Sequence, residues 1–514
     1  MSIMRLAASL IILVHSLTKS EKRYFKLSSN LQDGDKAYLA LFDSIGEKTT
    51  EEELRACFQE SQKGKNYEMA VKHLYKALLD CLVRLREKQD DQTRIFNMIS
   101  KANILFEREM VEEALACLEK AKEIAIEFES DYALLLILRT ELKFLSLSDF
   151  NGISEKELVG KQVRITEILK YSRNLNQHIQ LYDILRHRSM YKGYIRSDSQ
   201  KEQMNDLVVS ELHLIANHVY RDGFEAKKLH MLFQAAYYLN IGSYKLAIRN
   251  YRDLISLFEA NRHRLCVPPV YYYNAILGIL DSLHVAGLYS EMAPFLAKLE
   301  ELENDGYSME FSLRVLCNRY VYTSIAYQHQ GGFAEAVEFR KRYDEPLFRR
   351  MELLSLRAQL RLLLCDLSLA MYQERLKEAR KIASIIMGKG KLFQSFPLFK
   401  VVRLICLLLQ AELGNLDYLE PEIHSIKRNI HFDRRVYMTE RLVFQFVKEY
   451  PLPVYKMHKE RLWKKYHRAI AEIVEDKYER QLLKNFDFLV WIEHKLTRVS
   501  LDEIFRERVA SGAV

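Results

Sequence analysis

The sequence predicts an all-α protein, specifically an α-solenoid of helical hairpins with a helical cap at each end. The 514 residues include 17 glycines and 8 prolines, and no proline precedes Pro268. Residues that break helices are therefore scarce. A pattern of glycine, aromatic residue and small residue recurs about every 40–45 residues, which is typical of helical hairpins that bury a core when they stack.

The pattern is clearest from Met231 to Phe258, MLFQAAYYLNIGSYKLAIRNYRDLISLF. Gly242 is expected to end a first helix in a left-handed conformation, which is least costly for glycine. Tyr244 would cover the turn, and the small side chain of Ala247 would let two helices approach closely. Tyr251, four residues later, falls on the same helix face.

Copies that keep the glycine begin at Gly287, Gly331 and Gly414, and weaker copies without it centre on Ala70, Ala114 and Ala379. The long interval after Ala114 predicts two divergent units within about 154–219. The pattern resembles the tetratricopeptide repeat, whose signature has Gly, Tyr and Ala in this order and spacing. The resemblance covers roughly residues 50–446, with a period longer than the usual 34 residues.

The opening LTKSEKRYFKL and the closing FDFLVWIEHKL resemble those of a family of bacterial repeat proteins from the Bacteroidetes. This second resemblance implies no function. We expect an N-terminal cap at 1–49, a repeat array at 50–450 and a C-terminal cap at 451–514.

An apolar run, Leu6–Val14, is too short to span a membrane. We interpret it as a helix that packs on the first repeat; the alternative is an export signal at about 1–16. The seven cysteines are scattered singly without a CxxC pair, which favours reduced thiols and a cytoplasmic protein.

No HExxH, G-x-S-x-G or Walker motif is present, so we expect neither an enzyme nor a bound cofactor or metal. The net charge of +8 is mild for this length. Two basic stretches with aromatic residues, 186–196 and 456–468, leave nucleic-acid binding open as an alternative. Solvated helix faces are the simpler interpretation of both.

The resemblance to tetratricopeptide proteins implies a groove lined by the first helix of each hairpin. Alignment to that repeat places these candidate partner-binding residues in the groove: Asp281, His284, Tyr322, Gln328 and Met371. The sequence thus predicts a non-catalytic scaffold or adaptor that binds a protein or peptide segment of unknown identity. A regulatory sensor of a peptide or small ligand is the other alternative, and the groove could also be filled by the chain's own side chains.

Overall fold

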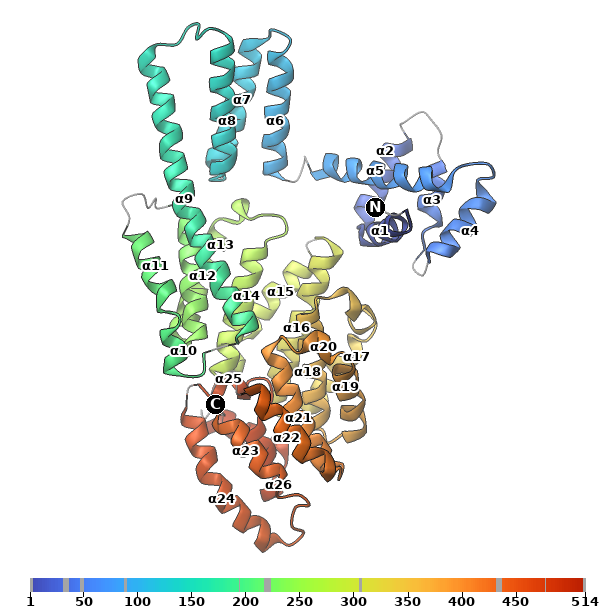
Figure 1. Ribbon diagram of the computed structural model, residues 1–514, viewed down its shortest axis with the longest axis vertical. Helices are drawn as coiled ribbons and strands as arrows, with labels where there is room; N and C mark the ends of the chain where they lie inside the picture. The colour runs from blue at the N-terminus through green and yellow to red at the C-terminus, as the bar shows by residue number, and fades with distance from the viewer. Residues whose placement is uncertain are drawn as a thin grey trace. The chain divides into compact units, whose positions relative to one another are not determined.

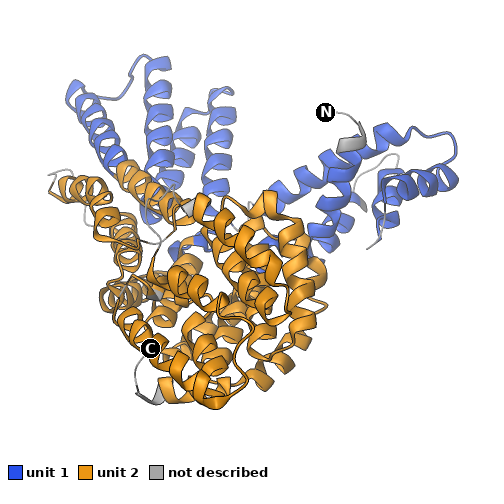
Figure 2. Ribbon diagram, turned by 60° about the horizontal axis from the view of Figure 1, so that its bottom comes forward, with its two compact units in different colours: residues 1–174, 263–270, 306–312 blue, residues 175–262, 271–305, 313–514 orange. Residues whose placement is uncertain are grey.

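The computed structural model describes residues 3–30, 37–46, 50–86, 90–193, 195–216, 223–304, 307–430, 437–476 and 478–511. It is 81% helical, and the described residues contain no strand, which confirms the all-α prediction. No helix in this described part is both long and apolar enough to cross a membrane. The chain forms two compact units, coloured separately in Figure 2.

Unit 1 comprises residues 1–174, 263–270 and 306–312. Its helices, labelled in Figure 1, are α1 (Ile3–Ser16), α2 (Lys19–Asn30), α3 (Ala37–Ser44), α4 (Glu51–Ser61), α5 (Tyr67–Arg86), α6 (Asp91–Phe106), α7 (Val111–Glu127), α8 (Asp131–Leu147) and the first half of α9 (Glu155–Tyr191).

One core joins α1 to α5. Leu10 of α1, Phe25 of α2 and Leu41 of α3 are buried with Phe58 of α4 and Leu74 of α5. The apolar stretch that begins the chain is therefore a packed helix, and this core includes residues on both sides of position 49. A second core of unit 1 joins α6, α7, α8 and the start of α9.

Unit 2 comprises residues 175–262, 271–305 and 313–514. The helices that lie wholly or mostly in it are α10 (Asp198–Glu202), α11 (Asn205–Ile215), α12 (Phe224–Asn240), α13 (Tyr244–Ala260), α14 (Val270–Val285), α15 (Ala293–Asn304), α16 (Met309–His329), α17 (Phe333–Arg342), α18 (Leu356–Tyr372), α19 (Leu376–Gly388), α20 (Gly390–Phe393), α21 (Pro397–Glu412), α22 (Leu416–Ile430), α23 (Met438–Val447), α24 (Lys456–Glu475), α25 (Arg480–Leu483), α26 (Phe488–Thr497) and α27 (Leu501–Ser511).

The predicted glycine turns are present. Gly242, Gly287, Gly331 and Gly414 have φ values of 79°, 72°, 75° and 77°. Two copies without glycine keep the same turn, because Glu109 and Glu374 adopt φ values of 64° and 54° at the equivalent position. A left-handed conformation costs a residue with a Cβ about 1–2 kcal/mol, so the packing of the two helices must offset that cost there.

The divergent middle differs from the prediction of two hairpin units. Residues 155–191 form the single helix α9, and the short helices α10 and α11 follow it. The stretch contains no proline, and its one glycine, Gly160, is exposed within the helix. Since nothing in this sequence ends a helix, α9 continues where the repeat period predicted a turn.

Helices α13 and α14 approach closely at Gly278, a buried residue in the middle of α14. The ring of Tyr251, from α13, occupies the space that a side chain would need there. A Cβ added at Gly278 would lie 2.1 Å from Cζ of this tyrosine, which is itself 5% exposed. The tyrosine that the repeat pattern singled out therefore fills a notch in the next helix.

We predict that Gly278→Ala lowers the free energy of unfolding by about 1–3 kcal/mol, because overpacking outweighs the better helix propensity of alanine. The matched control is Gly160→Ala in α9, where an added Cβ has no atom within 4 Å. That control should stabilise the protein by up to about 1 kcal/mol. Chemical denaturation measures both, and equal stabilisation by the two substitutions would contradict the placement of Tyr251.

Candidate functional site

Unit 2 contains a cavity of about 170 Å³, which we call the central cavity. Its walls come from α14, α16, α18 and α21, and from the residues that follow α9. α10 and the start of α23 also contribute to the lining, and a further wall is a stretch near the C-terminus, residues 478–488, which we call the inner segment. It contains the single turn of α25 and lines the cavity with Gln481, Leu482, Lys484 and Asn485.

Side chains of the surrounding helices hold the backbone of the inner segment. Nε2 of His284, on α14, donates a hydrogen bond to the carbonyl of Lys484 over 2.7 Å. The hydroxyl of Ser368, on α18, donates to the carbonyl of Asn485 over 3.2 Å. Because these bonds go to backbone groups, they would suit many sequences in an extended or turning segment.

Side chains of α18 and α13 also hold the inner segment. The amide of Asp487 donates to the Tyr372 hydroxyl over 2.6 Å, and the Tyr372 ring stacks on Phe486 with centroids 4.8 Å apart. Nε2 of Gln481 donates to the hydroxyl of Tyr244 over 2.7 Å. The inner segment is therefore bound along its length by side chains from α13, α14 and α18.

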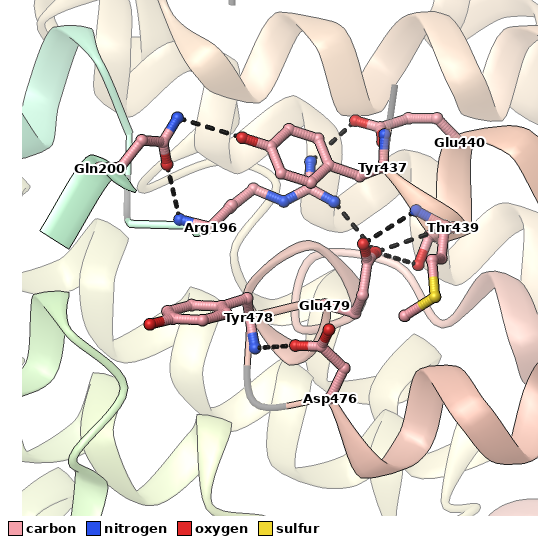
Figure 3. Close-up of polar contacts among 9 residues, drawn as sticks. Arg196, Gln200, Tyr437, Thr439, Glu440, Asp476, Tyr478 and Glu479 are labelled. Carbon is pink, nitrogen blue, oxygen red and sulfur yellow. Dashed lines mark hydrogen bonds and ion pairs between the residues drawn. The ribbon is translucent and has the colours of Figure 1, made fainter. Parts of the chain in front are cut away.

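A buried carboxylate, Glu479, anchors the start of the inner segment (Figure 3). It accepts hydrogen bonds from the amide of Met438 over 2.9 Å and from the hydroxyl of Thr439 over 2.6 Å. The Arg196 guanidinium bridges Glu479 at 3.0 Å and Glu440 at 2.7 Å. The two carboxylate side chains are 3% and 6% exposed, so charge-assisted bonds replace most of their hydration.

Aromatic and amide groups complete this network. The Arg196 guanidinium lies 3.8 Å from the ring centroid of Tyr437, a distance that suits a cation–π contact. Gln200 accepts a hydrogen bond from the backbone amide of Arg196 and donates to the Tyr437 hydroxyl, as Figure 3 shows. The loop after α9, the start of α23 and the inner segment are thus joined at one point.

The lining of the central cavity carries more positive than negative charge. Its basic residues are Lys192, Arg196, Arg357, Arg361, Lys400 and Lys484, and its carboxylates are Asp281 and Glu440. Both carboxylates are already paired, Glu440 with Arg196 and Asp281 with Arg361 at 3.4 Å. Among the residues that line the cavity, basic side chains therefore outnumber carboxylates.

Burial makes this charge distribution sensitive to pH. It lowers the pKa of Lys484 to about 8, although Asp281 opposes the shift. Burial alone would raise the pKa of Asp281, but the charges of Lys484 and Arg361 overcome it and hold that pKa below its usual range. At neutral pH the lining thus has an ionised carboxylate between two cations.

The structure brings together three of the five predicted groove residues. Asp281, His284 and Gln328 all line the central cavity. Tyr322 and Met371 do not line it, and both are fully buried. Alignment to the repeat did not show which of these positions pack against another helix.

Tyr322 has a helix-packing role that the sequence did not reveal. Its hydroxyl donates to the carbonyl of Leu277 over 3.2 Å, and its ring lies 4.4 Å from the Arg361 guanidinium. His284 and Gln328, each 3% exposed, also belong to the interior. The prediction of an open groove surface at these three polar residues is therefore wrong, because neighbouring helices and the inner segment cover it.

The first basic stretch separates into residues with different partners. Lys192 and Arg196 line the central cavity, whereas Arg188 pairs with Asp206 at 2.7 Å. Tyr194, the second aromatic residue of that stretch, lies outside the described residues. Sequence reasoning singled out these residues but could not show that two of them share a cavity with α18 and α21.

The second basic stretch forms one face of α24. Several of its cations pair with acids, among them Lys465 with Glu449 at 2.7 Å and Arg468 with Glu472 at 3.5 Å. This agrees with the simpler interpretation of a solvated helix face. No group of three or more His, Cys, Asp or Glu side chains among the described residues could hold a metal ion.

Two buried histidines lie between α14, α16 and the C-terminal helices. The rings of His284 and His329 meet edge to face with centroids 5.2 Å apart, and Tyr289 stacks on His329. Burial lowers the pKa of His329 to about 4, although Asp487 opposes the shift. Burial and the neighbouring His329 also hold the pKa of His284 well below its usual value. Both imidazoles are therefore neutral near pH 7.

Comparisons with family models, with curated proteins and with solved structures found no match for this chain. The likeness to tetratricopeptide repeats therefore depends on the turn residues and their spacing.

We predict that His329 makes the protein less stable in acid. The unfolded imidazole binds a proton below about pH 6.5 and the folded one below about pH 4, so stability is lost as pH falls through this window. His329→Phe, which keeps an aromatic ring beside Tyr289, should reduce the loss between pH 7 and pH 5 by about 2 kcal/mol. Urea denaturation at pH 7 and pH 5 measures the free energy of unfolding of His329→Phe and of the unsubstituted protein.

The matched control is His213→Phe, at an exposed histidine of α11. It should leave the pH dependence unchanged. Equal pH dependence in His329→Phe and the unsubstituted protein would show that this imidazole is not buried in a neutral form.

Proposed function

We propose that this protein is a non-catalytic scaffold or adaptor, an α-solenoid of tetratricopeptide-like hairpins that holds a segment of another protein against the inner side of its first helices. The observation that carries the proposal is the inner segment. His284, Ser368 and Tyr372 bind its backbone. The inner side of these helices can thus hold a peptide, and the central cavity continues along the same surface.

The size of the central cavity favours a segment over a complete small ligand. Pockets for drug-sized molecules usually have about 300–1,000 Å³. An engineered cavity of about 150 Å³ accommodates benzene, so the volume of about 170 Å³ found here suits one side chain. A segment that lies across the mouth of the cavity could insert one apolar residue.

The wall of the cavity suits such an anchor residue. Ile325 of α16, Leu364 of α18 and Leu398 of α21 all contribute to its lining. Burying a Leu-sized side chain among them would stabilise a complex by about 1.5–3 kcal/mol before the ordering of the segment is counted. Side chains from three successive hairpins would therefore recognise one residue of the partner.

The proposal predicts that filling the cavity weakens binding. Random peptides displayed on phage are selected on the full chain, and binders are then measured on Ile325→Trp. The larger side chain should occupy the cavity and weaken binding about tenfold or more. Circular dichroism and a thermal melt show whether the variant is folded.

The matched control is Ile385→Trp, at an isoleucine of α19 that is 48% exposed and does not line the cavity. It should leave the affinity unchanged. Failure to select any peptide, or binders that Ile325→Trp does not affect, would contradict the proposed function.

A further inference from the structure

The basic side chains at the central cavity come from elements that are separate in sequence. Lys192 follows α9, Arg357 is in the first turn of α18, and Lys400 is in the first turn of α21. All three are exposed to solvent while they line the cavity. The fold therefore brings together three cations, and only Lys192 belongs to one of the two basic stretches.

Lys192 and Arg357 make no side-chain hydrogen bond or ion pair with the residues that the structure describes. Some other basic side chains of unit 2 are paired with acids, for example Arg340 with Asp366 and Lys389 with Glu352. Among the described residues, no carboxylate thus pairs with these two cations at the mouth of the cavity. An unneutralised cation beside a low-dielectric wall attracts anions more strongly than one on an open surface.

The interior of the cavity adds to this charge. Lys484, from the inner segment, lies beside Asp281, and Asp281 also forms an ion pair with Arg361. Burial lowers the pKa of Lys484 to about 8, so the Lys484 side chain is mostly protonated at pH 7. A carboxylate that enters the mouth therefore meets a positive potential from the rim and from the floor.

We propose that the segment held at the central cavity is acidic, with carboxylate side chains flanking one apolar anchor residue. This inference rests on the proposed function and specifies its partner. The carboxylates would pair with Lys192 and Arg357 at the rim, while the apolar residue contacts Ile325, Leu364 and Leu398. The cavity volume of about 170 Å³ suits a side chain better than a nucleotide, which favours a peptide over a nucleic acid.

The experiment uses the peptides selected on the full chain whose binding Ile325→Trp abolishes. Their charge is determined by sequencing, and their affinity is measured by fluorescence anisotropy at low and high sodium chloride. We expect acidic residues on both sides of an apolar residue. The double variant Lys192→Gln with Arg357→Gln should weaken binding about tenfold or more, and Lys192→Glu with Arg357→Glu should weaken it further.

The matched control is Lys381→Glu, at an exposed lysine of α19 that does not line the cavity. It should change the affinity less than twofold. Because both rim residues are exposed, the double variants should keep the thermal melt of the unsubstituted protein, and this measurement separates lost binding from lost folding.

The outcomes distinguish this inference from the proposed function. Cavity-dependent peptides that are neutral or basic, or that bind both double variants normally, would overturn the acidic partner while the segment-binding function stands. The absence of any cavity-dependent peptide would overturn the function itself. Binding of single-stranded poly(U) that the double variants abolish, together with unaffected peptide binding, would assign the rim to a nucleic acid and also overturn the inference.

Discussion

The arrangement of unit 2 depends on the buried carboxylate of Glu479. It binds Arg196 from the loop after α9, and it accepts hydrogen bonds from Met438 and Thr439 at the start of α23. Loss of one partner from such a buried pair typically costs about 3–5 kcal/mol, because the other charge is left uncompensated. Three segments that are distant in sequence must therefore order together, and the inner segment is fixed beside α13, α14 and α18.

This constraint explains both the size and the charge of the central cavity. The inner segment occupies part of the space between α14 and α18, where His284 and Ser368 bind its carbonyl groups. What remains is about 170 Å³, enough for one side chain. The inner segment also contributes Lys484 to a lining whose two carboxylates are already paired. The contacts that complete the fold thus leave a small, positively charged site.

Local features of the fold could be predicted from the sequence, because glycine, capping and apolar spacing act over a few residues. The turns at Gly242 and Gly414 and the burial of Ala247 follow from that spacing. The continuous helix α9 was missed because a repeat period implies turns that the local sequence does not encode. Three of the five predicted groove residues line the central cavity, but the burial of Tyr322 depends on Leu277 and on helices that no local pattern specifies. The path of the inner segment was likewise not predictable, since it is fixed by contacts between residues 115 to 237 positions apart.

The measurement that tests this account most directly is hydrogen exchange of the inner segment in the full chain. The amide of Asp487 donates to the Tyr372 hydroxyl inside unit 2, so we expect it to exchange slowly, like the amides of α18. Glu479→Gln should accelerate exchange throughout residues 478–488 and leave α13 unchanged. Exchange of this segment at the rate of an unstructured peptide in the unsubstituted protein would contradict the account.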